Sequence, residues 1–337
     1  MQMLKNSVLC LLENARGGYL SGQFMADRLN VSRNAVWKCI SRLKKDGYII
    51  SSVTNKGYKL EEKSDVLSKD GIMKYIDKDK LSDFGQIHFF DTVDSTNNIA
   101  REAAASGCSE GYFAVAEKQN AGRGRRGRSF ISPKGSGVYM SVVVRPEFSF
   151  EESVKLTCLA AAAASECIEE VSGEPVGIKW VNDLYMNGRK ICGILSEGAL
   201  SVENGRFDFA VVGVGINVTD PPGGFPSEIA KKAGSVFGGK NPGGDIRCRI
   251  AGGFYNRFFD YYNNYRDGKF MDSYRSRLFF LGKKIRVIGA LGEYTATALD
   301  VNRSGELKVR LENGEQRILS SGEISIDVTG KEEKNED

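Results

Sequence analysis

The chain of 337 residues is 41% hydrophobic and 27% charged, with a formal net charge of +4, which is ordinary for a soluble globular protein of two or three domains. It contains neither the apolar core of a signal peptide nor a segment long enough to span a bilayer, so we expect neither export nor membrane insertion. Seven cysteines show no CxxC pair and no metal-like spacing, which favours a reduced, cytoplasmic protein and argues against a metal site built from protein ligands.

The first 64 residues are more basic than the rest of the chain. They carry 11 basic and 5 acidic residues, whereas the remainder is slightly acidic, so a polyanionic partner is expected for this part alone. Helical patterns occupy residues 5–13, 22–28 and 32–45, and the third begins at the N-cap candidate Ser32. It repeats apolar residues at the spacing of one buried face, Ala35, Val36, Cys39, Ile40 and Leu43.

The polar face of this third helix predicts contacts with nucleic acid. Strand-like runs at 48–53 and 57–60 follow it as a hairpin, so residues 1–64 resemble a winged helix-turn-helix DNA-binding domain. A small helical dimerisation or regulatory domain with a solvated basic face is the alternative. On the first interpretation, the residues that contact DNA are Ser32, Arg33, Asn34, Lys38 and Arg42.

The next segment joins a strand to a helix. Residues 87–90 read as a strand that contains His88, the only histidine, which we expect to pack and not to catalyse. Residues 91–98 then open a helix that runs to residue 105, and Ser95 or Thr96 is a suitable N-cap. Capping alone explains this sequence, although hydroxyls and the Asn97 carboxamide at a helix N-terminus can also bind a polar ligand group.

Residues 122–128 contain four arginines and three glycines and lie between strand-like runs at 112–116 and 138–144. Glycines let the backbone approach a ligand closely, and guanidinium groups suit phosphate oxygens. A disordered RNA-binding segment or a basic surface loop is the alternative, but strands on both sides fix this loop. The pattern therefore predicts a site for a phosphorylated or adenylated small molecule.

Charged residues interrupt an apolar hairpin at 178–186 and 189–195, whose turn is Asn187-Gly188. Lys179 and Asp183 form either a structural ion pair or part of a catalytic site, and Lys190 has no obvious local acid, which makes it the better candidate for an anionic ligand. Residues 152–171 read as a scaffold helix, and the strand at 209–218 has glycines where a ligand or backbone could approach.

The end of the chain alternates short strands and turns. Strand-like runs at 284–288, 294–301, 307–311, 316–319 and 324–328 predict a small β-barrel over 281–330, and residues 331–337 predict a disordered tail.

Taken in order, the segments 94–97, 119–128, 179–185, 189–195 and 213–217 resemble the motifs of biotin protein ligases. With the first 64 residues, the resemblance extends over nearly the whole chain to the bifunctional bacterial form. It implies an α+β chain with a winged helix-turn-helix at 1–64, a mixed α/β ligase domain at 65–280 and an SH3-like barrel at 281–330. Two departures are Val181, where the family usually has proline, and Phe130, where tryptophan is common.

The resemblance also implies an activity. Biotin and ATP, with magnesium, would form biotinyl-5′-adenylate, biotin would pass to a lysine of an apo biotin carboxyl carrier protein, and an adenylate-bound homodimer would bind operator DNA. A biotin-sensing regulator without efficient ligase activity and a lipoate-type ligase are the alternatives.

The resemblance assigns roles to particular positions. It places catalysis on Lys190, Arg125 and Asp183, and the side of the pocket that faces the nucleotide on Lys179, Asn182, Asp183 and Asn217. The positions that bind biotin or the adenylate are Ser95, Thr96, Asn97, Gln119, Gly122, Arg123, Gly124, Arg125, Arg128, Phe130, Lys190 and Gly193.

Overall fold

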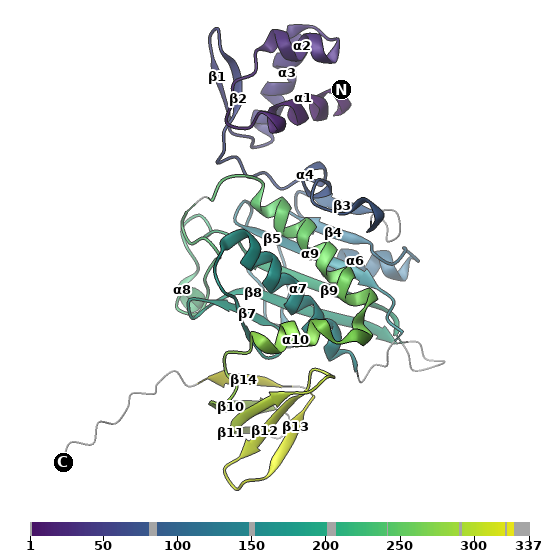
Figure 1. Ribbon diagram of the computed structural model, residues 1–337, viewed down its shortest axis with the longest axis vertical. Coiled ribbons are helices and arrows are strands. Elements are labelled where there is room, and N and C mark those ends of the chain that lie inside the picture. The colour runs from purple at the N-terminus through teal and green to yellow at the C-terminus, as the bar shows by residue number, and fades with distance from the viewer. Residues whose placement is uncertain are drawn as a thin grey trace, which may run out of the picture.

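The computed structural model describes residues 2–80, 86–147, 152–200, 207–240, 242–289, 292–320 and 322–326. A small helical unit, a central sheet covered by helices and a C-terminal sheet follow one another along the long axis of the molecule (Figure 1). The tail predicted at 331–337 lies outside the described residues.

The N-terminal unit is a helix-turn-helix followed by a hairpin. It contains α1 (Gln2–Asn14), α2 (Gly22–Leu29), α3 (Arg33–Lys45) and the antiparallel strands β1 (Ile50–Val53) and β2 (Gly57–Leu60). The Ser32 hydroxyl accepts a hydrogen bond from the Ala35 amide and caps α3, as the sequence predicts. The buried face of α3 belongs to a hydrophobic core that this unit forms by itself. The predicted three helices and hairpin are therefore confirmed.

The central sheet has the strand order β3-β4-β5-β9-β8-β7-β6. β3 and β4 pair in parallel, and the other neighbours pair antiparallel. The predicted hairpin joins β7 to β8, with positive φ at Asn187 and Gly188 as a tight turn of this kind requires. The strands are β3 (Ile87–Phe90), β4 (Phe113–Ala116), β5 (Gly137–Val144), β6 (Gly177–Lys179), β7 (Asp183–Met186), β8 (Arg189–Leu200) and β9 (Phe207–Asn217).

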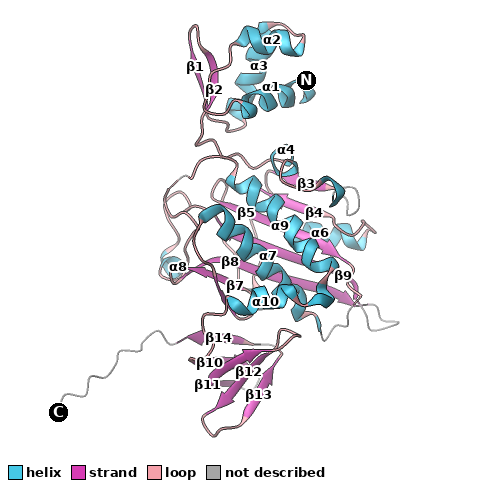
Figure 2. Ribbon diagram, viewed as in Figure 1, coloured by secondary structure: helices cyan, strands magenta, loops and turns pink. Residues whose placement is uncertain are grey.

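Helices cover the sheet unequally, as Figure 2 shows in cyan. The long helices α7 (Val154–Ser172) and α9 (Ile246–Asn263), with α10 (Lys269–Ser276), share the large apolar core with alternate residues of β5 and β9. On the other side, α6 (Thr96–Ala105) packs with Val143, Phe209 and Val211 in a smaller core. The remaining short helices are α4 (Lys69–Met73), α8 (Ser227–Ala230), and the 3-10 turns η1 (Arg125–Gly127) and η3 (Tyr265–Asp267). None of the helices in the described residues is long and apolar enough to cross a membrane.

The C-terminal strands form one antiparallel sheet of order β13-β12-β11-β10-β14. All five predicted strands are present, but no pairing in the described residues joins β13 to β14, so the predicted closed barrel is not observed there. The Trp180 indole donates a hydrogen bond of 2.9 Å to the Gly305 carbonyl and ties this sheet to the central domain. The strands are β10 (Lys284–Gly289), β11 (Gly292–Val301), β12 (Leu307–Leu311), β13 (Gln316–Leu319) and β14 (Glu323–Ile326).

A buried arginine joins the central domain to the segment that follows the N-terminal unit. Arg247, at the start of α9, is only 3% exposed. Its guanidinium donates 2.9 and 3.0 Å hydrogen bonds to the two carboxylate oxygens of Glu117, just after β4. It also donates to the Asp65 carboxylate at 3.1 Å and to the Asp65 carbonyl at 2.6 Å. The buried Glu117 carboxylate and the largely covered Asp65 carboxylate therefore depend on one cation.

We expect Arg247→Met to lower the free energy of unfolding by about 3–5 kcal/mol, because removal of one partner leaves buried charges without compensation. Urea unfolding followed by near-UV circular dichroism measures this. Arg266→Met is the matched control, since its side chain is 78% exposed, and it should change stability by less than about 0.5 kcal/mol. Equal stability of the two variants would contradict the buried-cation interpretation.

Candidate functional site

Glycines on one face of β8 and β9 make room for a pocket. Because strand side chains alternate between faces, Val212 and Val214 enter the large core while Gly213 and Gly215 point to the other side. A Cβ at Gly213 would clash directly with Asn97 Oδ1, and one at Gly215 would lie 2.6 Å from the Phe130 ring. The absence of side chains here lets α6 and the Arg loop, residues 122–128, approach the sheet.

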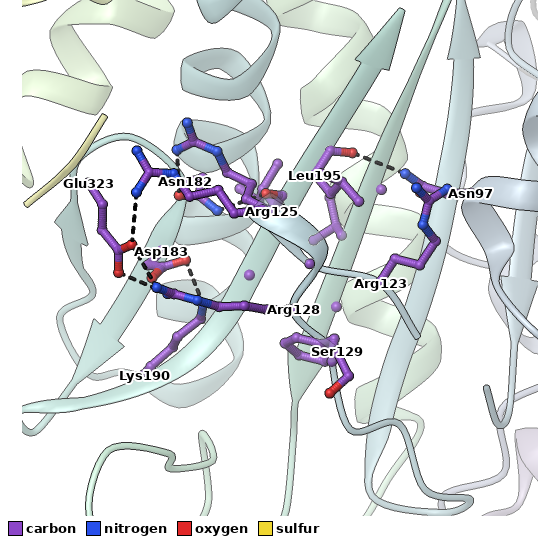
Figure 3. Close-up of a pocket in the computed structure, with 18 of the residues that line it drawn as sticks. Asn97, Arg123, Arg125, Arg128, Ser129, Asn182, Asp183, Lys190, Leu195 and Glu323 are labelled. Carbon is purple, nitrogen blue, oxygen red and sulfur yellow. Dashed lines mark hydrogen bonds and ion pairs between the residues drawn. The ribbon is translucent and has the colours of Figure 1, made fainter. Parts of the chain in front are cut away.

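A hydrogen-bond network holds the start of α6 over this floor. The Thr96 amide and hydroxyl donate to Gln119 Oε1 at 2.8 and 3.1 Å. Ser141 on β5 lies 2.7 Å from both Thr96 Oγ1 and Asn97 Oδ1. Asn97 also donates to Glu197 Oε2 at 2.7 Å. Its second donor bonds to the Leu195 carbonyl at 3.3 Å (Figure 3). The Asn97 carboxamide is therefore fully engaged with protein groups.

The predicted side-chain cap of α6 is not formed. Ser95 occupies the N-cap position, but its hydroxyl makes no capping hydrogen bond. The Thr96 side chain bonds to Gln119 instead, because the two segments lie side by side at the pocket. Both residues line the pocket, so their polar groups face it as the ligand-binding alternative expects.

The arginines of the Arg loop are held by acceptors from three different strands or turns. Arg123 lies 3.2 Å from Glu197 on β8, and Arg125 donates to Asn182 Oδ1 at 3.2 Å. Arg128 makes two 2.8 Å hydrogen bonds to Glu323 on β14, which hold the pKa of that carboxyl below its usual value. Figure 3 shows this group of side chains crossing the pocket from the sheet to the C-terminal domain.

Lys190 and Asp183 form the charged centre of the site. Lys190 Nζ lies 2.6 Å from Asp183 Oδ1, across the β7–β8 pair. This corrects the sequence analysis, in which Asp183 was a partner for Lys179 and Lys190 had no acid. Lys179 lies opposite Asp183 in the β6–β7 pair, but no ion pair joins the two among the described residues. Lys190 lies opposite Tyr185, two positions from Asp183 on the same face of β7, and its long side chain reaches the carboxylate diagonally. Apart from this ion pair, Asp183 Oδ1 is buried without a hydrogen-bond partner among the described residues.

Burial favours the neutral form of two cations at the same place. It lowers the pKa of Lys179 and the pKa of Arg125 from their usual values. Lys179 Nζ lies 5.8 Å from the centre of the Tyr185 ring, a cation–π arrangement, and forms no ion pair within the part of the chain that the structure describes. The Asp183 and Glu323 carboxylates oppose this effect on both groups, but burial is the larger influence. An anion that bound beside the two groups would favour their charged forms.

Most of the predicted residues meet at one cavity of about 130 Å³. Gly122 and Asn217 do not line it: Gly122 packs behind Phe130, and the Asn217 amide donates to the Gly234 carbonyl at 3.0 Å. The predicted lining residues present are Ser95, Thr96, Asn97, Gln119, Arg123, Gly124, Arg125, Arg128, Phe130, Lys179, Asn182, Asp183, Lys190 and Gly193.

Several residues that line the pocket were not among the site residues predicted from the sequence. Glu323 comes from β14, and nothing in the sequence places a C-terminal strand beside the Arg loop. Gly213 and Gly215 did give a signal, since glycines in a strand indicate a close approach of another group. The others are Arg126, Ser129, Trp180, Ile194, Leu195, Val214, Gly322 and Ile324.

The predicted DNA-contacting residues lie together on a separate surface. Arg33, Asn34, Lys38 and Arg42 are exposed on α3, and Ser32 is exposed at its N-cap. They do not contribute to the pocket. The arrangement is that of a recognition helix with one basic, solvent-facing side.

Comparison with known proteins agrees with this arrangement. Residues 89–217 match the biotin/lipoate A/B protein ligase family, residues 5–59 an HTH domain, and residues 280–327 the biotin protein ligase C-terminal domain. A bifunctional ligase/repressor, BirA of Bacillus subtilis, is 34% identical over 94% of this chain and 97% of its own length. The chain belongs to the biotin/lipoate A/B protein ligase family.

Two other members of the family are similar to a shorter part of this chain. BirA of Escherichia coli is 33% identical over 60% of this chain and 61% of its own length. The biotin protein ligase of Aquifex aeolicus, solved in complex with biotin and ATP, is 29% identical, with a TM-score of 0.59 over 72% of this chain and 98% of that one.

We expect Gly213→Ala to disrupt the pocket, because its Cβ would clash with the Asn97 carboxamide that holds α6. The variant should lose about 1–3 kcal/mol of stability, as for an overpacked core. Thermal unfolding and biotin binding by calorimetry measure the two effects. Gly239→Ala is the control, since the nearest atom to its Cβ is 4.0 Å away. Undiminished stability and biotin binding in Gly213→Ala would show that the glycine is not required.

Proposed function

We propose that this chain is an ATP-dependent biotin protein ligase that also acts as a biotin-responsive transcriptional repressor. It forms biotinyl-5′-adenylate and transfers biotin to a lysine of an apo biotin carboxyl carrier domain. The observation that carries the proposal is one pocket in which the Thr96–Gln119 network, the Arg loop and the Lys190–Asp183 pair face each other.

One part of the pocket suits the biotin half of the adenylate. Biotin has a polar ureido head on an apolar body, and Ser95, Thr96 and Gln119 line the pocket above the floor formed by Gly213 and Gly215. The ureido group would take the place of some of the hydrogen bonds that Thr96 and Gln119 now make with each other. Phe130 supplies an aromatic wall where the family commonly has tryptophan. Asn97 has its hydrogen bonds committed to protein groups, so we assign it the positioning of α6.

The first step joins two anions. A carboxylate oxygen of biotin attacks the α-phosphorus of ATP, a new P–O bond forms, and the bond to the β-phosphate breaks to release pyrophosphate. Lys190 and Arg125 lie where they can offset the repulsion and the charge that develops. Lys179 and Asn182 line the same part of the pocket and face the nucleotide in this assignment.

Magnesium would enter with the phosphates of ATP. The described residues contain no group of three or more His, Cys, Asp or Glu side chains that could hold a metal. Asp183, whose buried Oδ1 has the Lys190 ammonium 2.6 Å away and no hydrogen-bond partner among the described residues, would supply an oxygen ligand to the ion once Lys190 turned to the phosphates. Bound there, the ion would neutralise phosphate charge.

The Arg loop would close over the product of this step. A cavity of about 130 Å³ is smaller than the roughly 300–1,000 Å³ of ordinary ligand sites, so we infer that the loop moves to admit both substrates. Its return would exclude water from the reactive mixed anhydride. Phosphate groups would then replace Glu323 and Glu197 as partners of Arg128 and Arg123.

In the second step, the amine of the carrier lysine attacks the acyl carbon, AMP leaves and the amine loses a proton. We propose that the C-terminal sheet is an SH3-like cap that helps to bind ATP and the carrier, because Glu323 and Ile324 bring it to the pocket. The enzyme would act in the cytoplasm, which agrees with seven free cysteines.

The repressor function would use the N-terminal unit. The adenylate-bound form would dimerise, and two copies of α3 would each occupy the major groove of one operator half-site. The exposed Arg33, Lys38 and Arg42 would supply phosphate or base contacts.

Incubation with biotin, MgATP and an apo biotin carrier domain, followed by mass spectrometry of the carrier, tests the ligase. A gain of one biotin per carrier supports it. An unchanged mass, with biotin bound to the protein, would favour a biotin sensor over an enzyme.

We expect Lys190→Ala to slow adenylate formation by about a hundredfold or more, which is the usual loss for one preorganised charge donor. Pyrophosphate release in single-turnover experiments measures this step. Lys308→Ala, an exposed lysine on β12, is the control and should keep the normal rate. A normal rate in Lys190→Ala would remove this lysine from the mechanism.

Charge reversal on α3 should separate the two activities. Arg42→Glu is expected to weaken operator binding at least about tenfold and to reduce its salt dependence, because phosphate contacts release counterions. Electrophoretic mobility shifts at several salt concentrations measure this, with Arg266→Glu as control. Ligation should be normal in both variants, and an equal fall in ligation would contradict the division of labour between domains.

A further inference from the structure

An exposed tryptophan lies on the recognition helix. Trp37 is 55% exposed, although its neighbours Val36 and Cys39 on α3 are fully or almost fully buried. The chain has only two tryptophans, and the other, Trp180, is 3% exposed. Among the described residues, Trp37 takes part in none of the ring-stacking or cation–π contacts, whereas Tyr19 lies beneath Lys56 and Lys59 at 5.9 and 5.4 Å.

The indole lies between the start of α3 and the hairpin. Trp37 comes four residues after Arg33 and three after Asn34, so all three are neighbours on the helix surface. Two turns further on, on the same side, Lys44 donates a 2.9 Å hydrogen bond to Ser52 on β1. The ring therefore lies on the side of α3 that faces the hairpin, beside two residues able to contact bases.

The basic surface of α3 favours a polyanionic partner. The exposed Trp37 ring favours an apolar group on that partner. In the major groove, the C5 methyl of thymine is the apolar group that a base edge presents, and side chains contact it through apolar atoms. We propose that Trp37 is a specificity-determining residue that packs against a thymine methyl in each operator half-site. The proposal rests on the repressor function proposed above and names a base that the operator contains.

Phe24 provides a matched control within the same domain. It is 50% exposed on α2, next to the buried Met25 and Ala26. In a helix-turn-helix, the first helix of the pair crosses the backbone while the second enters the groove. Truncation of Phe24 therefore removes a similar exposed ring without removing a base contact.

The experiment first selects a duplex from a random-sequence library with the full chain, biotin and MgATP. Each thymine in the half-sites is then replaced by deoxyuridine, which lacks only the C5 methyl. We expect one thymine position, present in both half-sites, at which removal of each methyl weakens binding about fourfold. This is the change in affinity expected when one methyl group is no longer buried. Trp37→Ala should bind the thymine duplex more weakly and show no further loss at that deoxyuridine. Phe24→Ala should bind normally and keep the methyl dependence.

Tryptophan fluorescence gives a second readout. The emission of the native chain should change on addition of the selected duplex, and this change should be absent in Trp37→Phe, since Trp180 is buried. If the duplex binds but Trp37→Ala retains the full methyl dependence, the assignment of Trp37 is wrong and the repressor function stands. If no duplex is selected, the repressor function fails, and the assignment fails with it.

Discussion

The site depends on the alternation of side chains along β5, β8 and β9. One face of these strands is apolar and lies in the large core with α7 and α9. On the other face, Gly193, Gly213 and Gly215 present no side chain, so Asn97 and Phe130 can come within contact distance of the sheet. A side chain at Gly213 or Gly215 would displace a group that forms the pocket, whereas a Cβ at Gly193 would meet Phe130 and Lys190 at 3.3–3.4 Å.

Electrostatics gives the pocket a second constraint. Four arginines in one short loop would repel each other and the nearby lysines, yet carboxylates and an amide already accept hydrogen bonds or ion pairs from them: Glu197, Glu323 and Asn182. These partners come from separate elements, so the loop is ordered only when the domain has folded and the C-terminal sheet is in place. A phosphate that binds here replaces the charge-assisted hydrogen bonds between the arginines and protein carboxylates with similar bonds to its own oxygens. The binding free energy is therefore only the difference between these two sets of hydrogen bonds.

Local patterns predicted much of this structure. Periodicity and caps located α3, the Asn187-Gly188 turn located the β7–β8 hairpin, and the Gly-Arg composition located the Arg loop. Features set by register or by distant contacts were not predictable. Lys190 reaches Asp183 diagonally across the β7–β8 pair although Lys179 lies directly opposite Asp183, and Glu323 reaches Arg128 across 195 positions of sequence. The hydrogen bonds of Thr96 to Gln119 are also contacts between segments that are distant in sequence, so local capping patterns do not reveal them.

The N-terminal unit combines an independent core with a rigid connection. Its apolar residues form a cluster of their own, so this unit can fold without the pocket. The segment after it is nevertheless fixed, since Arg247 holds Asp65 and also Glu117, two residues before the pocket residue Gln119. Arg16 adds a second link through Asp245, at the N-terminus of α9. In this structure the N-terminal unit therefore meets the central domain through the same polar contacts that anchor the strand leading into the pocket.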